Sequence, residues 1–380
     1  MATVNLPGGR KLVLTDRTAW AKPVKPAESR IAYAAAHVVA DPLAENSPGA
    51  PAVLDWESTL DFRRHLWAHG FGVAEAMDTA QRGMGLDYTA TRELIRRSAA
   101  EAAACGGRIV AGVATDQLPV GPASLDQVHA AYGSQLADVL HAGATPVLMC
   151  SRHLAAAARD ADDYLHIYRD LLDTSDKPVV LHWLGTAFDP ALEGYWGSSD
   201  VEKATETVLE LINANPAKVD GIKISLLDAD HEIRLRRRLP AGVRLYTGDD
   251  FNYPTLIRGD EQGYSDALLG IFAAIAPAAA AALAALDRGD LDEYDRILAP
   301  TVPLSRHIFK APTFYYKTGI VFLAWLAGHQ NHFTMVGGLQ SGRSVPHFAK
   351  LIELADAAGL LPDPSLAAYR ANRFFEVTAG

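Results

Sequence analysis

The sequence predicts an α/β fold in which eight parallel strands, each followed by a helix, close into a barrel. The first observation is alternation, because short β-branched runs, each followed by a longer helical pattern, recur from about residue 30 to about residue 285. The second is the number of these runs, since eight strands close a (β/α)8, or TIM, barrel. The third is composition: 49% hydrophobic and 21% charged residues in a chain of 380 are typical of a globular protein with a substantial core.

The eight expected strands are short runs rich in Val, Ile and Leu, and Gly, Pro or polar residues bound them. The run from Val219 to Ser225 alternates most clearly between aliphatic and small or polar residues. Strands of a parallel barrel pack against helices with one face and fill the interior with the other. We therefore expect strands at residues 31–38, 72–76, 108–113, 146–150, 178–183, 219–225, 243–247 and 264–271.

The helical patterns between these strands carry their own start and stop signals. Ser124 followed by Gln127, and Ser199 followed by Glu202, predict capping boxes at the N-termini of two helices. Gly106 marks the end of the helix that precedes the third strand. These signals separate helices from strands at several independent points and strengthen the barrel prediction.

Two segments outside the repeating pattern predict additions to the barrel. Residues 1–25 carry apolar residues on both sides of a Pro-Gly-Gly turn, which is typical of a small N-terminal hairpin or arm. Residues 26–285 are the expected barrel, with an exposed loop rich in Pro, Ala, Ser and Gly at 41–54. Residues 286–380 show only helical patterns, at 291–298, 315–327, 347–358 and 366–375, and predict a C-terminal helical extension packed on the barrel.

Charge and composition exclude several classes of function. Lys plus Arg number 35 against 45 Asp plus Glu, and the net charge of −10 argues against a general nucleic-acid or anionic membrane surface. Only two cysteines are present, which fits a reducing cytoplasm, and the first residues lack the pattern of a secretory signal. The apolar stretch 267–286 is mostly alanine, is interrupted by Pro277, and predicts a buried strand and helix. We expect a cytoplasmic protein without nucleic-acid or membrane partners.

In a parallel barrel, reactive groups lie at or just beyond the carboxyl ends of the strands, where the βα loops gather. This rule selects a set of candidate side chains that share such a position. They are His37 after the first strand, Asp78 and Thr79 after the second, Asp116 after the third, Arg152 and His153 after the fourth, His182 at the end of the fifth, Lys223 in the sixth, and Asp249 and Asp250 after the seventh.

Lys223 is the strongest of these candidates. The period of two in a strand places it on the same face as Gly221 and Ser225, opposite an aliphatic face that should meet the helices. A lysine that points into the interior has its pKa lowered by burial from about 10.4, which favours the neutral amine. A neutral amine attacks ketones and aldehydes, and the protonated imine is an electron sink for breaking or making a C–C bond.

Another interpretation of Lys223 is an ion pair with Asp220, Asp249 or Asp250, or a position at a frayed strand end. A lysine is almost never fully buried unless it is paired. The interpretations differ in whether the amine lies in a dry cavity with room for a carbonyl compound.

Three runs resemble successive landmarks of the dihydrodipicolinate synthase / N-acetylneuraminate lyase family. They are Lys-Pro-Val-Val-Leu-His at 177–182, Val-Asp-Gly-Ile-Lys at 219–223 and Leu-Tyr-Thr-Gly-Asp-Asp at 245–250, and runs at 316–318 and 342–346 resemble the family's closing helices. The resemblance implies a TIM barrel with a C-terminal helical extension, class I Schiff-base chemistry on Lys223, and a homodimer or homotetramer. The whole chain is similar to a divergent bacterial branch grouped with this family as a domain of unknown function.

The sequence departs from the family pattern at three places. The Gly-Thr-Thr-Gly-Glu run that holds the carboxylate of pyruvate is replaced by Glu-Ala-Met-Asp-Thr-Ala-Gln at 75–81. The tyrosine that ends strand five and relays protons is replaced by His182, and the Pro-Pro-Tyr-Tyr run after strand four is replaced by Cys-Ser-Arg-His at 150–153. The resemblance therefore supports Lys223 as the imine-forming residue and does not support pyruvate as the substrate.

We expect a carbon–carbon lyase or aldolase of carbohydrate metabolism that acts on a small keto or aldehyde compound, such as one derived from a sugar, without a cofactor. His182, with an ordinary pKa near 6.5, is expected to move the proton, although a core histidine bonded to the backbone is an equal alternative. The expected substrate-binding groups are hydrogen-bond donors and acceptors suited to hydroxyl groups. Arg152 is suited to a carboxylate, so a keto acid is also a candidate substrate. They are Asp78, Thr79, Asp116, Arg152, His153, Asp249 and Asp250.

Two other functions fit the same barrel. Enough ligands for one divalent ion, as in a metal-dependent isomerase or aldolase, are offered by His37, Asp78, His153, His182 and either Asp228 or His231, although no tight metal-binding spacing occurs. A non-catalytic barrel that binds a sugar-like ligand is the other alternative, because the family's tyrosine and carboxylate-binding run are both absent.

Overall fold

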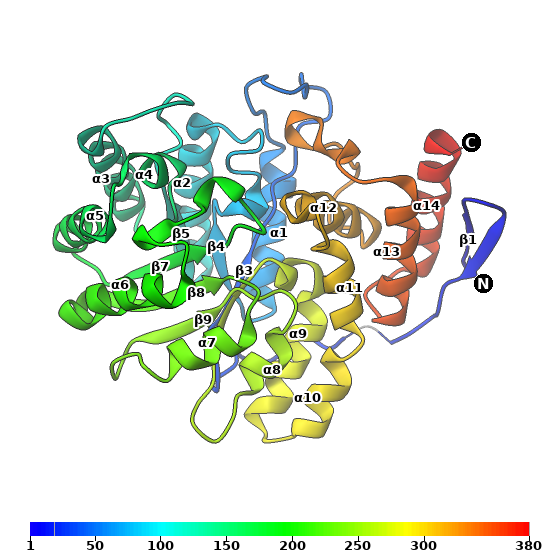
Figure 1. The fold of residues 1–380 in the computed structure, drawn as a ribbon. Helices are drawn as coiled ribbons and strands as arrows, with labels where there is room; N and C mark the ends of the chain where they lie inside the picture. The colour runs from blue at the N-terminus through cyan, green and yellow to red at the C-terminus, as the bar shows by residue number, and fades with distance from the viewer. Residues whose placement is uncertain (19, 380) are drawn as a thin grey trace. The chain divides into compact units, whose positions relative to one another are not determined.

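The computed structural model describes residues 1–18 and 20–379 and has the predicted fold class. Eight strands form a closed barrel in the order β10-β3-β4-β5-β6-β7-β8-β9, and a separate two-stranded antiparallel sheet joins β1 and β2 near the N-terminus (Figure 1). Helices follow the barrel strands, and a helical region ends the chain. Residue 19 of the predicted arm and residue 380 of the predicted extension lie outside the described residues.

The strands lie where the sequence predicts them, with shorter bounds at several ends. The hairpin strands are β1 (Thr3–Leu6) and β2 (Arg10–Val13). The barrel strands are β3 (Ala32–Ala35), β4 (Gly72–Glu75), β5 (Ile109–Val113), β6 (Thr145–Leu148), β7 (Val179–Leu184), β8 (Val219–Ser225), β9 (Arg244–Thr247) and β10 (Asp266–Leu269). The prediction for the first and eighth strands was too long because buried apolar residues continue past each strand into the next segment.

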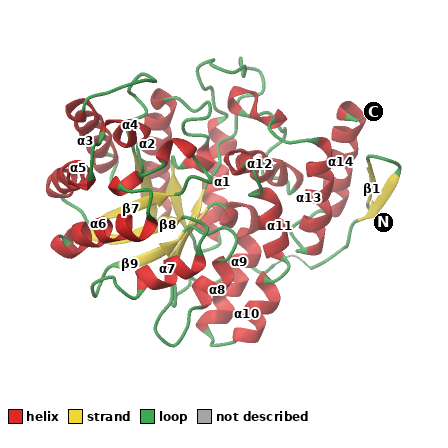
Figure 2. Ribbon diagram, in the orientation of Figure 1, coloured by secondary structure: helices red, strands yellow, loops and turns green. Residues whose placement is uncertain are grey.

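The helices account for most of the remaining chain (Figure 2). Those between strands are α1 (Trp56–Ala68), α2 (Tyr88–Cys105), α3 (Leu125–His141), α4 (Arg152–Ala157), α5 (Ala161–Thr174), α6 (Val201–Ala214), α7 (Ala229–Arg236) and α8 (Tyr253–Arg258). Those after the last strand are α9 (Ile271–Asp287), α10 (Leu291–Leu298), α11 (Thr301–Ile308), α12 (Tyr316–Leu326), α13 (Val345–Ala357) and α14 (Pro364–Thr378). The sequence prediction missed α11, because Pro303 in its first turn resembles a break although proline is compatible with a helix start.

One of the two predicted capping boxes is present and the other is wrong. Ser124 and Gln127 form the reciprocal pair of bonds at the start of α3. At the start of α6 the cap is Asp200, whose Oδ1 accepts the N–H groups of Glu202 and Lys203 at 3.0 and 3.4 Å. Both Ser and Asp can cap a helix, and the backbone enters this one a residue later than predicted.

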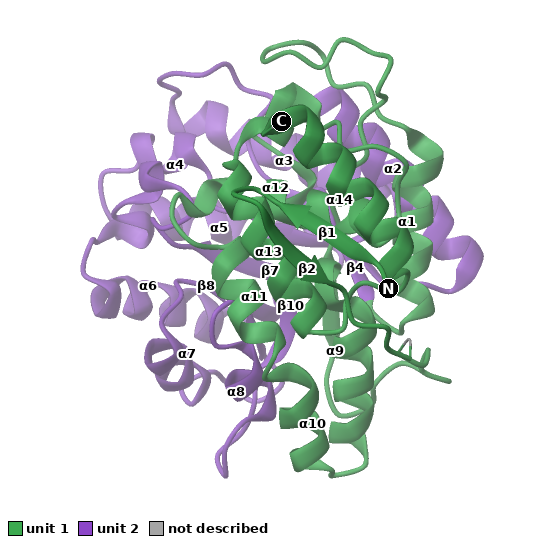
Figure 3. Ribbon diagram, turned by 90° about the vertical axis from the view of Figure 1, so that its right-hand side faces the viewer, with its two compact units in different colours: residues 1–71, 78–86, 270–380 green, residues 72–77, 87–269 purple. Residues whose placement is uncertain are grey.

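The chain forms two compact units, drawn in different colours in Figure 3. One consists of residues 1–71, 78–86 and 270–380 and holds the N-terminal hairpin, β3, α1 and α9 to α14. The other consists of residues 72–77 and 87–269 and holds β4 to β10 with the helices between them. The division into an arm at 1–25, a barrel at 26–285 and an extension at 286–380 stays a prediction. Within residues 1–18 and 20–379, every helix is either too short or too polar to cross a membrane.

The stretch 267–286 forms a strand and a helix, as the sequence predicts. Strand β10 is buried along its length, and α9 buries most of its alanines. Pro277 lies inside α9, and the helix is kinked at Ile275, whose φ and ψ are −118° and 17°. The kink follows from the proline, which removes a backbone donor and crowds the preceding turn.

Three neighbouring strands of the second unit place their side chains in register. His182 of β7 pairs with Lys223 of β8, and Lys223 pairs with Tyr246 of β9. Laterally paired residues of a parallel sheet point to the same face. His182, Lys223 and Tyr246 therefore form one row across β7, β8 and β9.

The opposite face of these strands packs against helix α7. The ring of Trp183 contacts the ring of His231 with centroids 5.6 Å apart, and Thr247 Oγ1 donates to Glu232 Oε2 at 3.1 Å. Because α7 covers this face, the row that contains Lys223 faces the barrel interior. The aliphatic residues of β8 thus face the helices, as the alternation of residues along this strand predicts.

Candidate active site

Lys223 extends from the inner face of β8 and is 7% exposed. Its aliphatic chain passes over Gly248, the residue after β9: a Cβ at that position would lie 2.8 Å from Lys223 Cε and closer still to Ser225 Oγ. Contacts that short do not occur between real side chains, so the space is available only to glycine. Gly248, the first residue of the Gly-Asp-Asp run, therefore leaves the space that the Lys223 side chain occupies.

His182 lies beside Lys223 and is fully buried. Its Nε2 lies 3.3 Å from Ser225 Oγ, and its Nδ1 has no hydrogen-bond partner among the described residues. Burial, and then the positive charge of Lys223, hold the pKa of His182 well below 6.5. The imidazole is therefore neutral at pH 7. The expectation of an ordinary histidine pKa was wrong here, because the interior removes water from the ring.

A thiol fixes the end of the strand that carries His182. Cys150 Sγ, just after β6, donates to the backbone oxygen of His182 at 3.1 Å and accepts the N–H of Leu184 at 3.5 Å. The two bonds lie on either side of Trp183 and hold the backbone of β7 beside that of the preceding loop. They restrict the position of the imidazole without touching its ring.

A tyrosine fills the barrel on the amino-terminal side of the lysine. A Cβ at Gly221 would lie 2.7 Å from Tyr246 Cε2, so the aromatic ring packs directly on this glycine. The Tyr246 hydroxyl donates to Asp220 Oδ2 at 2.6 Å, and Arg244 Nη1 donates to Asp220 Oδ1 at 2.7 Å. Both oxygens of Asp220 thus accept from groups other than Lys223. The polar atoms of this layer are satisfied within β8 and β9.

Asp249 shapes the turn after β9. It is 1% exposed, its Oδ1 accepts the N–H groups of Phe251 and Asn252 at 2.8 and 3.0 Å, and its Oδ2 accepts Asn252 Nδ2 at 2.8 Å. These are the bonds of an aspartate that stabilises its own turn. Asp250, the next residue, is 4% exposed.

Behind this turn, Glu232 of α7 is a buried acid that the sequence did not single out. Its Oε1 accepts Ser265 Oγ at 2.7 Å and its Oε2 accepts Thr247 Oγ1 at 3.1 Å. Burial, together with the charge of Asp249, raises the pKa of Glu232 to about 8. The side chain is therefore protonated at neutral pH.

This proton makes the stability of the fold depend on pH. The unfolded chain releases the Glu232 proton near pH 4.5 and the folded chain near pH 8, so the folded state binds more protons between these values. The free energy of unfolding should fall by on the order of 1 kcal/mol per pH unit across this window because of this one group. We expect Glu232→Gln to flatten that slope, as measured by urea unfolding at pH 5, 6, 7 and 8. The exposed Glu261→Gln is the control, and equal slopes in the two variants would contradict the expectation.

The predicted groups after β5 and β6 form a second cluster in the same unit. Thr115 Oγ1 lies 2.6 Å from Ser151 Oγ and 3.0 Å from His153 Nδ1, while His153 Nε2 lies 3.1 Å from the backbone oxygen of Pro119. Asp116 Oδ1 accepts Gln135 Nε2 at 2.9 Å. The bonds of Thr115 connect the loops after β5 and β6 to each other, and the bond of Asp116 connects the loop after β5 to α3.

Arg152 points away from this cluster. Its Nε donates to Asp189 Oδ2 at 2.5 Å, and its side chain is 50% exposed. The guanidinium is thus held at the surface by the loop after β7. It does not form the buried anion site that the sequence left open.

The remaining predicted residues belong to the other compact unit. Thr79 is buried and its hydroxyl lies 2.8 Å from that of Tyr316. Asp78 begins the short 3-10 helix Asp78–Ala80. His37 Nε2 lies 2.9 Å from Gln330 Oε1, and burial beside Arg63 lowers the pKa of His37 to about 3.

The histidines considered as metal ligands have other partners. His37 contacts Gln330, His153 contacts Thr115, His182 contacts Ser225, and His231 Nε2 lies 2.8 Å from Thr205 Oγ1. In the part of the chain that the structure describes, no three His, Cys, Asp or Glu side chains are grouped as a metal-binding set. The metal-dependent alternative therefore lacks a ligand set among these residues.

Three residues of the lysine's surroundings were absent from the predicted site. Ser225 shares the inner face by the period of two, and Gly248 follows strand seven directly, so both carried a signal in the sequence. Tyr246 alternates with Thr247 in a short strand whose register on β8 only the structure provides. The period of two that places Lys223 on the inner face of β8 also predicts that Ser225 lies on that face.

Solved structures share this fold. YagE, a prophage protein of the dihydrodipicolinic acid synthase family from E. coli K12 in complex with pyruvate, matches with a TM-score of 0.67 at 14% identity, covering 87% of this chain and 99% of that one. Dihydrodipicolinate synthase from Aquifex aeolicus matches at 0.65 and 12%, covering 87% and 99%, and that from Bacillus clausii at 0.64 and 17%, covering 88% and 99%. No curated protein matches the sequence.

These comparisons confirm the predicted resemblance at the level of fold. The chain has a (β/α)8 barrel fold like that of these structures, with a buried lysine on the inner face of its strand β8. It belongs to the family described as protein of unknown function DUF993, which matches residues 7–379.

Proposed function

We propose that the chain is a carbon–carbon lyase or aldolase in which Lys223 forms a Schiff base with a ketone or aldehyde. The observation that supports this function is the arrangement around one amine. Lys223 lies on the inner face of β8, is nearly buried, and passes over Gly248 beside the neutral imidazole of His182. Burial disfavours the charged form of an amine, and the neutral amine is the nucleophile.

The proposed reaction begins with attack of Lys223 Nζ on the carbonyl carbon. The carbinolamine that forms loses one water molecule and leaves a protonated imine on the lysine. As the hydroxyl on the β carbon loses its proton, the bond between the α and β carbons breaks and a carbonyl fragment is released. The electron pair of that bond forms the C=C bond of an enamine, and the C=N π pair moves onto nitrogen. Protonation of the enamine carbon and hydrolysis of the imine return the free amine and the second product.

His182 is the proposed proton carrier. C–C cleavage needs a group that accepts the proton of the departing hydroxyl, and the neutral imidazole is the form that can accept it. Its Nδ1 has no protein partner among the described residues, and its Nε2 is oriented by Ser225. The same imidazole then returns the proton to the enamine carbon.

The proposed substrate class is a polyhydroxylated carbonyl compound of the kind derived from sugars. The groups proposed to bind its hydroxyls are Asp116, His153 and Asp250 of the second unit. A carboxylate substrate would need donors in place of these acids.

Borohydride trapping tests the proposal. The full chain is incubated with keto acids, keto sugars and sugar aldehydes, each with and without sodium borohydride, and then digested for mass spectrometry. We expect reduction to leave a stable secondary amine on the peptide that contains Lys223, with the mass of one substrate. Turnover of a substrate without any adduct on that peptide would contradict the proposal.

Replacing His182 by glutamine should separate imine formation from C–C cleavage. The imine still forms, because Lys223 is intact, while loss of the proton carrier should lower kcat by roughly a hundredfold. Borohydride trapping and steady-state turnover on the same substrate measure the two steps. His231→Gln is the matched control, since His231 is equally buried but lies against α6 and should leave kcat unchanged. A parallel loss of trapping in His182→Gln would show a structural role.

A further inference from the structure

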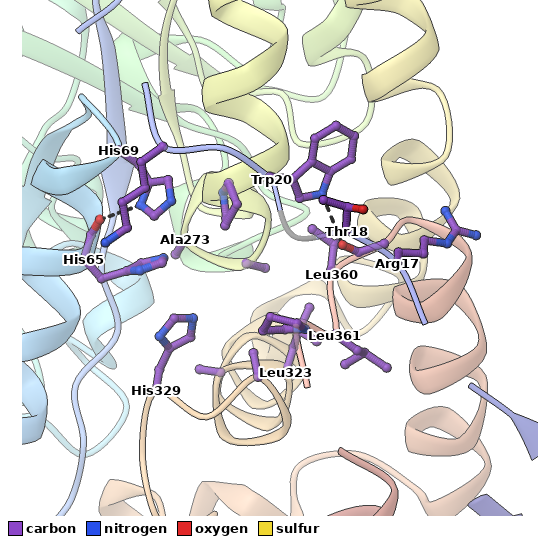
Figure 4. A pocket seen from close by; sticks show the side chains of 17 residues that line it. Arg17, Thr18, Trp20, His65, His69, Ala273, Leu323, His329, Leu360 and Leu361 are labelled. Carbon is purple, nitrogen blue, oxygen red and sulfur yellow. Dashed lines mark hydrogen bonds between the residues drawn. The ribbon is translucent and has the colours of Figure 1, made fainter. Parts of the chain in front are cut away.

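A cavity of about 200 Å³ lies within the unit of residues 1–71, 78–86 and 270–380, and no part of it belongs to the candidate active site (Figure 4). Its wall is formed by the N-terminal segment at residues 17, 18, 20 and 22, by helices α1, α9 and α12, and by residues 359–362. Most of this wall is apolar, with side chains such as Pro277, Leu323 and Leu361.

Three histidines gather on one side of the cavity. His65 and His69 are four residues apart on α1 and its C-cap, and His329 follows α12. The ring centroid of His65 lies 4.4 Å from that of His69 and 4.2 Å from that of His329. Figure 4 shows the three rings facing the cavity from one side, with Trp20 and Leu360 on the other. The cavity therefore has a polar end and an apolar end.

The polar end of the cavity has imidazole nitrogens that are not used in hydrogen bonds to other described protein groups. His69 Nδ1 lies 2.8 Å from the backbone oxygen of His65, but the ring nitrogens of His65 and His329 bond no other protein atom in the described residues. At the apolar end, Trp20 Nε1 is already satisfied by the backbone oxygen of Gly359 at 3.1 Å. A ligand that enters the cavity thus meets unused imidazole nitrogens at one end only.

Lys22 is the cation at the histidine end, whereas Arg17 lies beside Gly359 and Trp20 at the other end. Among the described lining residues of the cavity none is an Asp or a Glu. Burial, and then the basic groups of His329, His69, Lys22 and His37, lower the pKa of His65 to about 2, and burial lowers that of His329 to about 4. Both rings are therefore neutral at pH 7, and each keeps one N–H donor. The ammonium of Lys22 attracts an anion and repels a cation at this end of the cavity.

We propose that this cavity binds a small monocarboxylic acid with an apolar body of about one ring. The carboxylate accepts N–H groups from His65 and His329 near the ammonium of Lys22, and the body packs against Trp20 and Leu360. The volume suits such a ligand, because a cavity of roughly 150 Å³ already holds benzene. The site is independent of the proposed lysine chemistry.

Isothermal titration of the full chain tests the proposal with phenylacetate and its neutral isostere phenylacetamide. We expect one phenylacetate per chain and an affinity for the amide that is lower by about tenfold, which is the loss of a charge-assisted hydrogen bond. Phenylacetate has no ketone or aldehyde, so Lys223→Met should bind it like the unmodified chain. Equal affinity for the amide, or the absence of saturable binding up to about 10 mM, would overturn the proposal.

Variants locate the binding. His329→Leu should weaken phenylacetate binding by about tenfold, and Lys22→Met by about threefold because its ammonium is exposed. The matched controls are His166→Leu on α5 and Lys25→Met on the same N-terminal segment as Lys22, and both should bind as the unmodified chain does. Lys22 is on the surface, so its variant remains informative if His329→Leu fails to fold. Unchanged affinity in Lys22→Met and in a folded His329→Leu would refute the assigned site.

Discussion

Replacing Lys223 by methionine should abolish borohydride trapping and lower turnover by at least about a thousandfold, since the residue supplies the nucleophile of the proposed reaction. Methionine keeps the length of the side chain and fills the same space next to Gly248. Thermal unfolding of the variant separates a loss of the nucleophile from a loss of the fold, because Lys223 is 7% exposed.

The measurement combines trapping, steady-state turnover and thermal unfolding on the same preparation. Lys218→Met is the matched control: Lys218 precedes β8 and its Nζ donates to the backbone oxygen of Ser175 at 2.9 Å, outside the barrel interior. Retained turnover in Lys223→Met would refute the Schiff-base proposal. Lost turnover with retained binding of the substrate would argue against a barrel that only binds ligands.

Replacing Gly248 by alanine should have the second largest effect. The new methyl group would lie 2.8 Å from Lys223 Cε and closer to Ser225 Oγ, so either the lysine chain or the loop after β9 must move. A displacement of about 1 Å at a reacting group costs roughly a hundredfold in rate, and overpacking costs about 1–3 kcal/mol of stability. The expected signature is slower imine formation at Lys223, followed by borohydride trapping over time.

Gly133→Ala in α3 is the matched control for this substitution. A Cβ there meets no atom within 4 Å, and alanine favours a helix more than glycine does by up to about 1 kcal/mol. This variant should be as active as the unmodified chain and slightly more stable. Unchanged trapping rates in Gly248→Ala would show that the lysine does not depend on the space above this glycine.

The inner face of β8 was predictable because a strand's period of two depends on the backbone alone. Val219–Ser225 alternates without a break, so the phase of Lys223 followed from its aliphatic neighbours. The barrel itself followed from eight such runs and the helices between them. The start of α6 did not follow, because Ser199 and Asp200 are both good caps and only the backbone path selects between them.

Properties that arise from contacts between distant segments could not be predicted. The pKa of His182 depends on its burial and on Lys223. His182 and Lys223 are distant in sequence and become neighbours only in the barrel. The same holds for Glu232, whose partners Thr247 and Ser265 come from later segments. The His65 and His329 contact joins residues of α1 and the end of α12, and no local pattern indicates it.

The packing of the Tyr246 ring on Gly221 closes off one direction of approach to the amine. A molecule that reaches Lys223 must come from the side of the strands' carboxyl ends, and whatever is made there must depart the same way. In the cleavage that we propose for Lys223, both fragments share this single way out. We therefore expect the unattached carbonyl fragment to leave before water frees the piece still joined to nitrogen.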